Sequence, residues 1–512
     1  MSWRGYSIFG LFILFLAGAM TAPLILSAYQ GEWTLARAFG FAAIVLAVLA
    51  LLISLANYRR SYPSQARSEF LTLFGVLALC PAFAALPMKI ALPQYAFEAH
   101  YFEMAGALTT TGASIFDRPG ELPDAVNLWR AMVAWIGGFV ALIMAFALLA
   151  PRNLGGYEVR SASSRGGAVG RLRGLPAWAG GVKREAAGDR IESAIRSVAP
   201  IYVALTLILA VGFAVLGQGG LKAFASAMSL MSTSGVQIDN AGMFADIGTP
   251  GEVLAVLFLV LAATRHVYRG DVNLDERFSR FAADPELRLL IAATSAVTLW
   301  LFMRHWLGAL QLDLAEMPEI TEPLAAFWGA FFTALSFATT AGVPSASWEA
   351  ARAWSGLGNP GLVLIGLAVM GGGIASTAGG VKLLRAYALY KHGVREMERL
   401  VRPSSISGTG QAKRGLRREG AQIAWVFLML FLLALGLTML ALSLTGLQFE
   451  LALTAAVAAL SNTGPVFQAA MDDASWLTSL TPEARAIAVA AMILGRVETL
   501  ALIAMLNPGN WR

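Results

Sequence analysis

Four short segments of the chain combine oxygen-bearing side chains with a glycine, a combination suited to holding a cation. Each segment has at least two threonine, serine or asparagine residues within the three positions before its glycine. Glycine allows successive backbone carbonyls to point to one side, and carbonyl and hydroxyl oxygens replace the water shell of an ion. The candidate ligands are Thr110, Thr111, Gly112, Thr233, Ser234, Gly235, Thr340, Ala341, Gly342, Asn462, Thr463 and Gly464.

The four turns recur in the same context, which indicates internal repetition. Each follows a semi-apolar stretch too short to cross a bilayer and precedes a longer apolar one. A half-helix that ends at membrane depth directs the negative end of its dipole at what lies beyond it. One such turn would be an ordinary loop, but four of them predict four units around a central axis. The short stretches are Phe97–Leu108, Leu221–Met231, Leu324–Phe337 and Glu450–Leu460.

The elements that must position these turns are membrane helices. The 512 residues are 57% hydrophobic and 14% charged, whereas soluble proteins carry about 25% charged residues. The apolar residues gather in blocks, and about 20 such residues cross a bilayer as a helix. We therefore predict an all-α membrane protein with ten crossings, at about 8–28, 38–56, 70–90, 126–149, 196–216, 250–264, 288–307, 358–390, 421–445 and 485–506.

The charges predict the orientation of these crossings. Arginine and lysine gather in segments 57–69, 151–196 and 391–418, which lie on one side if there are ten crossings. Cytoplasmic loops carry this excess, so we expect both termini in the cytoplasm and the chain in a bacterial cytoplasmic (inner) membrane. The opposite loops, among whose acidic residues we count Glu103 and Glu252, would concentrate cations at the outer mouth, or they are ordinary solvated loops.

Several motifs resemble the Trk/Ktr/HKT superfamily of potassium transporters, most closely the membrane subunit of the bacterial Trk uptake system. They are Thr110-Thr111-Gly112, Trp135-Ile136-Gly137-Gly138, the segment from Gly371 to Lys382, and Leu494-Gly495-Arg496-Val497-Glu498. The resemblance covers nearly the whole chain, and two extra N-terminal helices favour the Trk branch. The later turns vary from the first, and Ala341 is the least typical residue because it removes a hydroxyl.

The resemblance implies two N-terminal helices followed by four helix–pore helix–filter–helix repeats around a central pore. The glycines then predict the boundaries of the units. These are 1–66 for the extra helices, 67–155 for the first repeat, 156–193 for a cytoplasmic loop, 194–282 for the second repeat, 283–412 for the third repeat with an intramembrane gate loop, and 413–512 for the fourth.

A glycine-rich segment interrupts the apolar stretch 358–390. Glycine costs about 1 kcal/mol relative to alanine inside a helix, so the middle of this stretch should be unwound. Close helix packing through small residues is the alternative. In the family that we take as a guide, this segment obstructs the pore beneath the filter and moves on opening. The implied gate residues are Gly371, Gly372, Gly373, Ser376, Thr377, Gly379 and Gly380, with Lys382 either a further candidate or a cytoplasmic charge.

Arg496 interrupts the last apolar stretch. An arginine there is costly unless it faces protein or water. It could reach the cytoplasmic surface near Glu498, whereas the resemblance implies that it projects into the pore below the filter as an electrostatic barrier, acting together with the gate loop.

The resemblance implies uptake of K⁺, bound at the filter residues and nowhere else, by a homodimer in membrane lipid. A cytoplasmic regulatory subunit with nucleotide-binding domains would join it, since this chain has no such domain. The net charge of +6 is explained by the inner loops, so we expect no nucleic-acid partner. We also expect no cofactor bound by this chain. A sodium-coupled or sodium-permeable transporter of the same fold is the alternative. A membrane enzyme is a further one, but the four histidines do not cluster, so we expect no enzyme.

Overall fold

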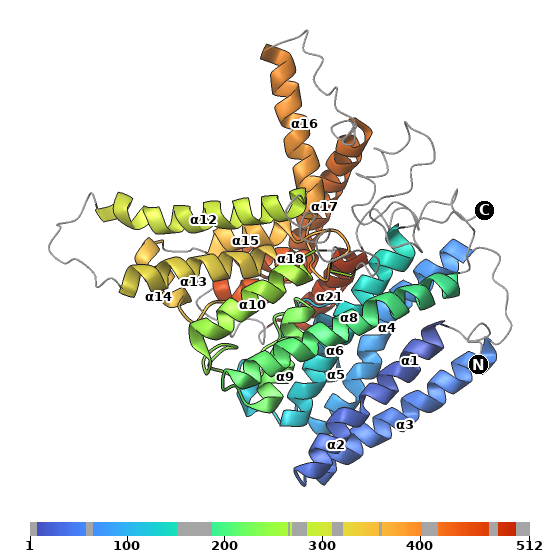
Figure 1. The fold of residues 1–512 in the computed structure, drawn as a ribbon. Coiled ribbons are helices and arrows are strands. Elements are labelled where there is room, and N and C mark those ends of the chain that lie inside the picture. Colours follow the sequence, from blue (N-terminus) through green and yellow to red (C-terminus); the bar gives the residue numbers. More distant parts are fainter. Residues whose placement is uncertain are drawn as a thin grey trace.

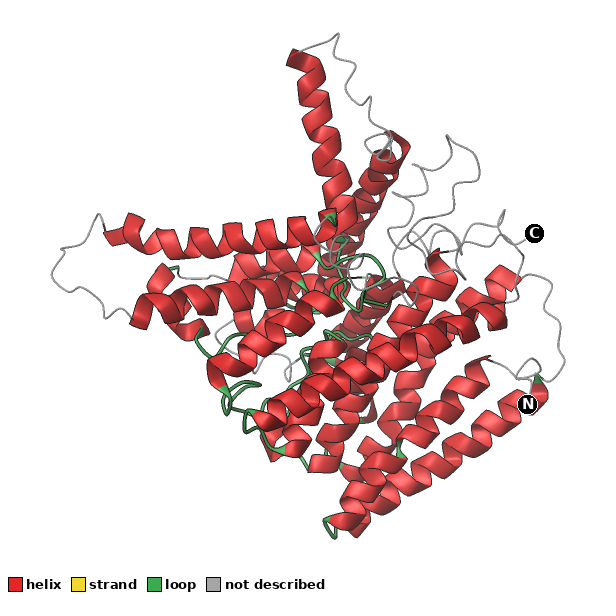
Figure 2. Ribbon diagram, viewed as in Figure 1, coloured by secondary structure: helices red, strands yellow, loops and turns green. Residues whose placement is uncertain are grey.

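The computed structural model describes residues 8–57, 65–150, 187–264, 267–268, 284–309, 321–357, 361–401, 418–470 and 480–497. Every regular element within these residues is a helix (Figure 2). The expected all-α membrane protein is therefore confirmed. Seven helical stretches are long and apolar enough to cross a membrane.

Each of the ten predicted crossings contains helix in the described residues. Two of them are composite, because α1 and α2 meet at Met20 and because a glycine-rich loop separates α15 from α16. The crossings are α1 (Ile8–Ala19) with α2 (Thr21–Tyr29), α3 (Trp33–Ala56), α4 (Gln65–Ala91), α6 (Asp124–Ile143) with the π-helical turn η3 (Met144–Leu149), α8 (Ala187–Val215), α10 (Gly248–Ala262), α12 (Pro285–Ala309), α15 (Gly361–Met370) with α16 (Leu383–Val401), α17 (Arg418–Leu444) and α21 (Pro482–Val497).

Four further helices end at the four glycine turns. They are α5 (Phe97–Leu108), α9 (Gly220–Met231), α13 (Thr321–Ala338) and α18 (Phe449–Ser461). Three have about the predicted length, and α13 is longer, with 18 residues. Two short helices were not predicted, α14 (Trp348–Ser355) and α19 (Val466–Ala470), and each follows a turn directly.

The helices of neighbouring repeats interlock in a closed order (Figure 1). Each short helix packs against the long helix before it, in the pairs α4 with α5, α8 with α9, α12 with α13 and α17 with α18. Each also contacts the last helix of another repeat, in the pairs α6 with α9, α10 with α13, α15 with α18 and α21 with α5. The last pair joins the fourth repeat to the first, so the four repeats enclose one axis.

Two parts of the chain lie outside this ring. Helices α1 to α3 cover one flank of the first repeat, where they contact α4 and α6. Helix α16 starts against α12 and α17, and its other end extends beyond the helical body (Figure 1). The predicted cytoplasmic loop 156–193 lies, except for its last seven residues, outside the described residues, as do both termini.

Candidate ion pathway

The four turns share one unusual backbone conformation. The residue two positions before each glycine has a positive φ, although none of these residues is glycine. Such a conformation is uncommon for residues with a Cβ atom, so its recurrence at one position shows that the turns are structural repeats. The angles are 55° at Thr110, 52° at Thr233, 62° at Thr340 and 53° at Asn462. Gly112, Gly235 and Gly342 also have positive φ, between 68° and 70°, and Gly464 does not.

Each glycine lies against the next repeat, so the turns themselves form a ring. A Cβ atom on three of the glycines would overlap a carbonyl oxygen of the neighbouring turn. The added Cβ would lie 1.8 Å from the Ser234 oxygen at Gly112, 2.2 Å from the Ala341 oxygen at Gly235, and 2.6 Å from the Thr111 oxygen at Gly464. At Gly342 the nearest atoms are side-chain carbons of Thr463 and Pro465, at 3.1 Å. Each turn therefore packs against the next in chain order, and the fourth packs against the first, as the helices of the repeats do.

The third turn has the same backbone hydrogen bonds as the first, despite Ala341. The amides of Thr111 and Gly112 both donate to the carbonyl of Gly106, at 2.8 and 3.0 Å. The amides of Ala341 and Gly342 both donate to the carbonyl of Ser336, at 2.9 and 3.1 Å. The missing hydroxyl therefore leaves the backbone of the third turn unchanged.

The fourth turn is the one that differs in its backbone. The Gly464 amide donates to the Thr111 carbonyl at 2.5 Å, and the Asn462 amide nitrogen Nδ2 donates to Thr111 Oγ1 at 3.0 Å. The same Nδ2 also donates to the Met492 carbonyl at 2.9 Å. These bonds join the first and last repeats directly.

Two glycine-containing motifs of the long helices pack closely against the ends of the short helices, next to the turns. A Cβ atom on Gly137 of α6 would lie 2.1 Å from the carbonyl of Leu108, at the end of α5. A Cβ atom on Gly495 of α21 would lie 2.3 Å from the carbonyl of Leu460, near the end of α18. These glycines allow the helices to approach the turns closely.

The chain is not helical between α15 and α16, as the glycine cluster predicted. All residues of this 371–382 loop are buried. Three of its contacts reach the second turn, the third turn and α9, the helix that precedes the second turn. Thr377 Oγ1 lies 3.1 Å from Thr233 Oγ1 and donates to the Met231 carbonyl at 3.4 Å, and the Gly379 amide donates to Thr340 Oγ1 at 2.9 Å. The predicted gate residues and filter residues are thus in direct contact.

The loop is also attached on its other side. The Gly373 amide donates to the carbonyl of Ala263, which follows α10, at 3.2 Å. The Ile374 amide donates to Glu286 Oε2 at 3.2 Å. Glu286 lies in the first turn of α12 and is buried, so this carboxylate connects the loop to the start of the third repeat.

Arg496 connects the loop to the first turn. Its Nε and Nη2 atoms donate to the Thr109 carbonyl at 2.9 and 2.6 Å, and Nη1 donates to the Thr377 carbonyl at 2.7 Å. The residue is only 7% exposed. The alternative in which Arg496 reaches the membrane surface does not fit these contacts; Glu498 lies outside the described residues.

Lys382 is not a charge in cytoplasmic solvent, which was one of its two predicted environments. It is buried at the end of the loop, with a φ of 79°, and its Nζ donates to the Ala378 carbonyl. The ammonium group thereby holds the last residues of the loop together.

The sequence did not reveal two buried carboxylates beside the turns. Glu103 and Glu252, assigned above to the acidic outer loops, are 2% and 1% exposed. Glu103 pairs with Arg130, and Glu252 accepts hydrogen bonds from Trp328, Ser345 and Ala346. The available signal was a charged residue within an otherwise apolar helix, which usually faces the protein interior. Within the described residues, no group of three or more His, Cys, Asp or Glu could hold a metal ion.

These features define a class of membrane protein in which four re-entrant turns surround one pathway. Residues 198–508 match the sequence profile of a family described as "TrkH: Cation transport protein". The match spans more than half of the chain, and the chain belongs to this family of cation transport proteins.

Relatives and a solved structure match over nearly the full length. The Trk system potassium uptake protein TrkH of Escherichia coli is 26% identical over 507 residues, which cover 99% of this chain and 98% of that protein. The protein of the same name from Vibrio parahaemolyticus is 27% identical over 470 residues, which cover 89% and 88%. The crystal structure of the potassium transporter TrkH from Vibrio parahaemolyticus has the same fold, with a TM-score of 0.76, 24% identity and 98% of each chain covered.

Proposed function

We propose that this protein takes up potassium ions across the cytoplasmic membrane through the ring of four glycine turns. The observation that supports this proposal most directly is the closed ring, in which each turn packs against the next, three of them against a backbone carbonyl and the third against side chains of the fourth. The names of the relatives, which are Trk potassium uptake proteins, support the choice of ion. The membrane potential, at about 2.3 kcal/mol per charge per 100 mV, would drive the uptake.

In this proposal, carbonyl and hydroxyl oxygens of the twelve turn residues given above are the potassium ligands. The four short helices end at these ligands, so their dipoles favour a cation there. The repeats would function as the four units predicted from the sequence, with boundaries near residues 67, 194, 283 and 413.

The 371–382 loop and Arg496 are the proposed gate. The guanidinium charge beside the Thr109 carbonyl would repel a cation that leaves the first turn, because charges interact strongly in a poorly solvated interior. The hydrogen bonds to Thr233, Thr340 and Thr377 would hold the loop closed until regulation releases it.

A homodimer and a cytoplasmic nucleotide-binding partner complete the proposal. The basic segments 151–196 and 391–418 would bind that partner on the inner side of the membrane. Co-purification of the partner with the intact chain, and its loss when either segment is deleted, would support this arrangement. Retention of the partner by both deletion variants would contradict it.

The test of the function is rescue of a bacterium that lacks its own potassium uptake systems. The intact chain should restore growth at low potassium, and Gly112→Ser should not, because the new side chain would overlap the Ser234 carbonyl. Failure of the intact chain to restore growth, although it is present in the membrane, would contradict potassium uptake. Fluxes of rubidium and sodium into proteoliposomes then separate potassium uptake from the sodium-permeable alternative.

A further inference from the structure

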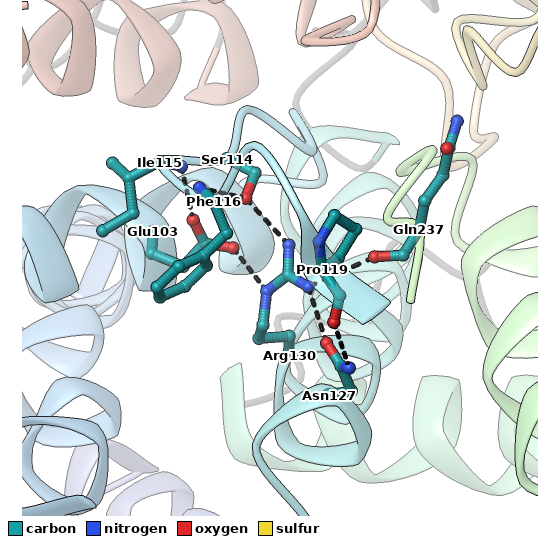
Figure 3. A network of polar contacts seen from close by, with 8 residues as sticks. All are labelled: Glu103, Ser114, Ile115, Phe116, Pro119, Asn127, Arg130 and Gln237. Atoms are coloured by element: carbon teal, nitrogen blue, oxygen red, sulfur yellow. Dashed lines mark hydrogen bonds and ion pairs between the residues drawn. The ribbon is translucent and has the colours of Figure 1, made fainter. Parts of the chain in front are cut away.

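A buried ion pair lies directly behind the first turn (Figure 3). Arg130 of α6 donates from Nε to Glu103 Oε1 of α5 at 2.6 Å. Their side chains are 2% and 3% exposed. Removing two charges from water is costly, so such a pair needs good geometry and further hydrogen bonds to be tolerated.

Three of the four further hydrogen bonds go to segments that leave the turns. The second oxygen of Glu103 accepts from the Ile115 amide at 2.9 Å, and Arg130 Nη2 donates to Ser114 Oγ at 2.9 Å. The Arg130 guanidinium also lies 5.3 Å from the centre of the Phe116 ring. The pair thus holds Ser114, Ile115 and Phe116, which follow the first turn.

Arg130 reaches the second repeat as well. Its Nη1 donates to Asn127 Oδ1 at 2.9 Å and to the carbonyl of Gln237, two residues after Gly235, at 3.2 Å. Figure 3 shows Gln237 on a segment separate from the other residues of this network. One side chain therefore fixes the first turn relative to the second.

The third repeat makes the corresponding backbone contact with a neutral side chain. Thr333 lies nine positions before Gly342, as Glu103 lies nine before Gly112, and Thr333 Oγ1 accepts from the Ser345 amide at 3.1 Å. Ile115 and Ser345 are each three positions after their glycine. The corresponding residues of the second and fourth repeats are Ser226 and Ala455. Only the first repeat has a carboxylate at this position. Among the residues that the structure describes, only there does an arginine side chain extend the contact to a neighbouring turn.

We propose that Glu103 and Arg130 are positioning residues that set cation selectivity by fixing the distance between the first and second turns. A filter discriminates between ions through the number and position of its oxygen ligands. If the segments after Gly112 and Gly235 were released, the ligands could move inward and accept a smaller cation. This inference rests on the proposed function and adds two selectivity determinants to it.

The test is the ratio of rubidium to sodium flux through purified protein in proteoliposomes. Glu103→Gln removes the negative charge that balances the buried Arg130, and Arg130→Lys keeps the positive charge but loses the planar guanidinium that reaches several acceptors at once. Both variants should lower the ratio roughly tenfold, as expected when hydrogen bonds to a buried charged group are lost. A role as a simple positive charge would instead leave Arg130→Lys unchanged.

The matched control is Arg118→Gln. It breaks the Arg118–Glu121 pair, 3.1 Å apart, in the same outer segment, but those side chains are 73% and 64% exposed. The flux ratio should remain that of the intact chain. If the Arg130 variants do not fold, Ser114→Ala removes a single acceptor of the fork and should still lower the ratio.

The outcomes separate this inference from the proposed function. If the intact chain is selective and all folded variants keep its ratio within about twofold, the pair is only structural and the inference is wrong. If the intact chain carries neither ion, the proposed function fails and the inference fails with it. A lowered ratio in the Glu103 and Arg130 variants, with the control unchanged, would support both.

Discussion

At the scale of single residues, Arg496 has the most informative environment. Three of its nitrogen atoms donate to two backbone carbonyls, one in the first turn and one in the 371–382 loop. A buried cation that hydrogen-bonds carbonyl oxygens occupies a place where a transported cation would otherwise be favoured. Its removal should therefore both loosen the loop and remove a repulsive charge.

We expect Arg496→Ala to raise basal rubidium flux in proteoliposomes by roughly tenfold or more, since a hydrogen bond to a charged group contributes about 1.5–3 kcal/mol. Arg485→Ala, on the same helix and three turns closer to its start, is the control and should have the basal flux of the intact chain. Unchanged flux in folded Arg496→Ala would argue against a barrier role.

Residue types were a good guide to the turns and a poor guide to burial. The threonine and glycine patterns predicted which positions form the four turns, because the required conformation restricts the sequence. Glu103 and Glu252 were assigned to acidic outer loops because their segments lie opposite the basic ones. A charge within an apolar helix suggested burial, but the partners come from elsewhere in the fold: Arg130 on α6 for Glu103, and Trp328 and Ser345 of the third repeat for Glu252.

At the scale of elements, the 371–382 loop is held from two sides. Glu286 on α12 accepts a hydrogen bond from the Ile374 amide, and the turns hold the opposite side through Thr377 and Gly379. Glu286→Ala should raise basal rubidium flux several-fold, because the loop loses one attachment. Glu286→Gln keeps an oxygen acceptor at this place and should stay close to the intact chain. Equal flux in all three proteins would show that Glu286 does not restrain the loop.

A second element, the segment after the second turn, is held by Lys222 at the start of α9. Its Nζ lies 2.5 Å from Asp239 and 2.6 Å from Asp246. The hydrogen bond from Lys222 lowers the pKa of Asp239 below its usual value of 3.8. A carboxyl group whose pKa is lowered by folding stabilises the fold above its unfolded pKa, and this contribution is lost as the pH falls through the folded pKa.

We therefore expect Asp239→Asn to lower the thermal unfolding midpoint at neutral pH. Its difference from the intact chain should shrink as the pH falls below 3.8 and disappear once the pH is below the lowered, folded-state pKa of Asp239. Unfolding followed by tryptophan fluorescence in detergent would measure this. The difference should also shrink at high salt, because the Asp239 side chain is 37% exposed. A difference that is independent of both pH and salt would indicate a packing effect instead.

The elements themselves were largely predictable, since hydrophobic length alone gave the ten crossings and the four short helices. The break in the eighth crossing also followed from the glycine cluster. Helices α14 and α19 were missed, because their eight and five residues are too short to show a periodic pattern. The partners of the 371–382 loop could not be predicted, since they come from five other parts of the chain: the second turn with α9, the end of α10, the start of α12, the third turn and α21.

At the scale of the whole molecule, the ring of turns makes the four glycines unequal. A Cβ atom would overlap a backbone carbonyl at Gly112, Gly235 and Gly464, but at Gly342 it would meet only side-chain carbons at 3.1 Å. An overlap with a carbonyl can be relieved only if a neighbouring turn moves, whereas a contact at 3.1 Å needs a shift of only a few tenths of an ångström.

Alanine substitutions should therefore abolish potassium uptake at Gly112, Gly235 and Gly464, and reduce it least at Gly342. The strain of a positive φ, about 1 kcal/mol for a residue with a Cβ atom, remains at Gly342 and keeps this change from being silent. Growth at low potassium, together with the amount of folded protein in the membrane, would rank the four variants. A ranking in which Gly342→Ala is the most damaging would contradict the ring.

The contact between α21 and α5 also has a consequence for how the protein is made. The ring closes only when α21 reaches the first repeat, so a growing chain keeps an open flank beside α5 until α21 has been made. Any product that ends before residue 482 lacks this contact, and its four-repeat ring stays open.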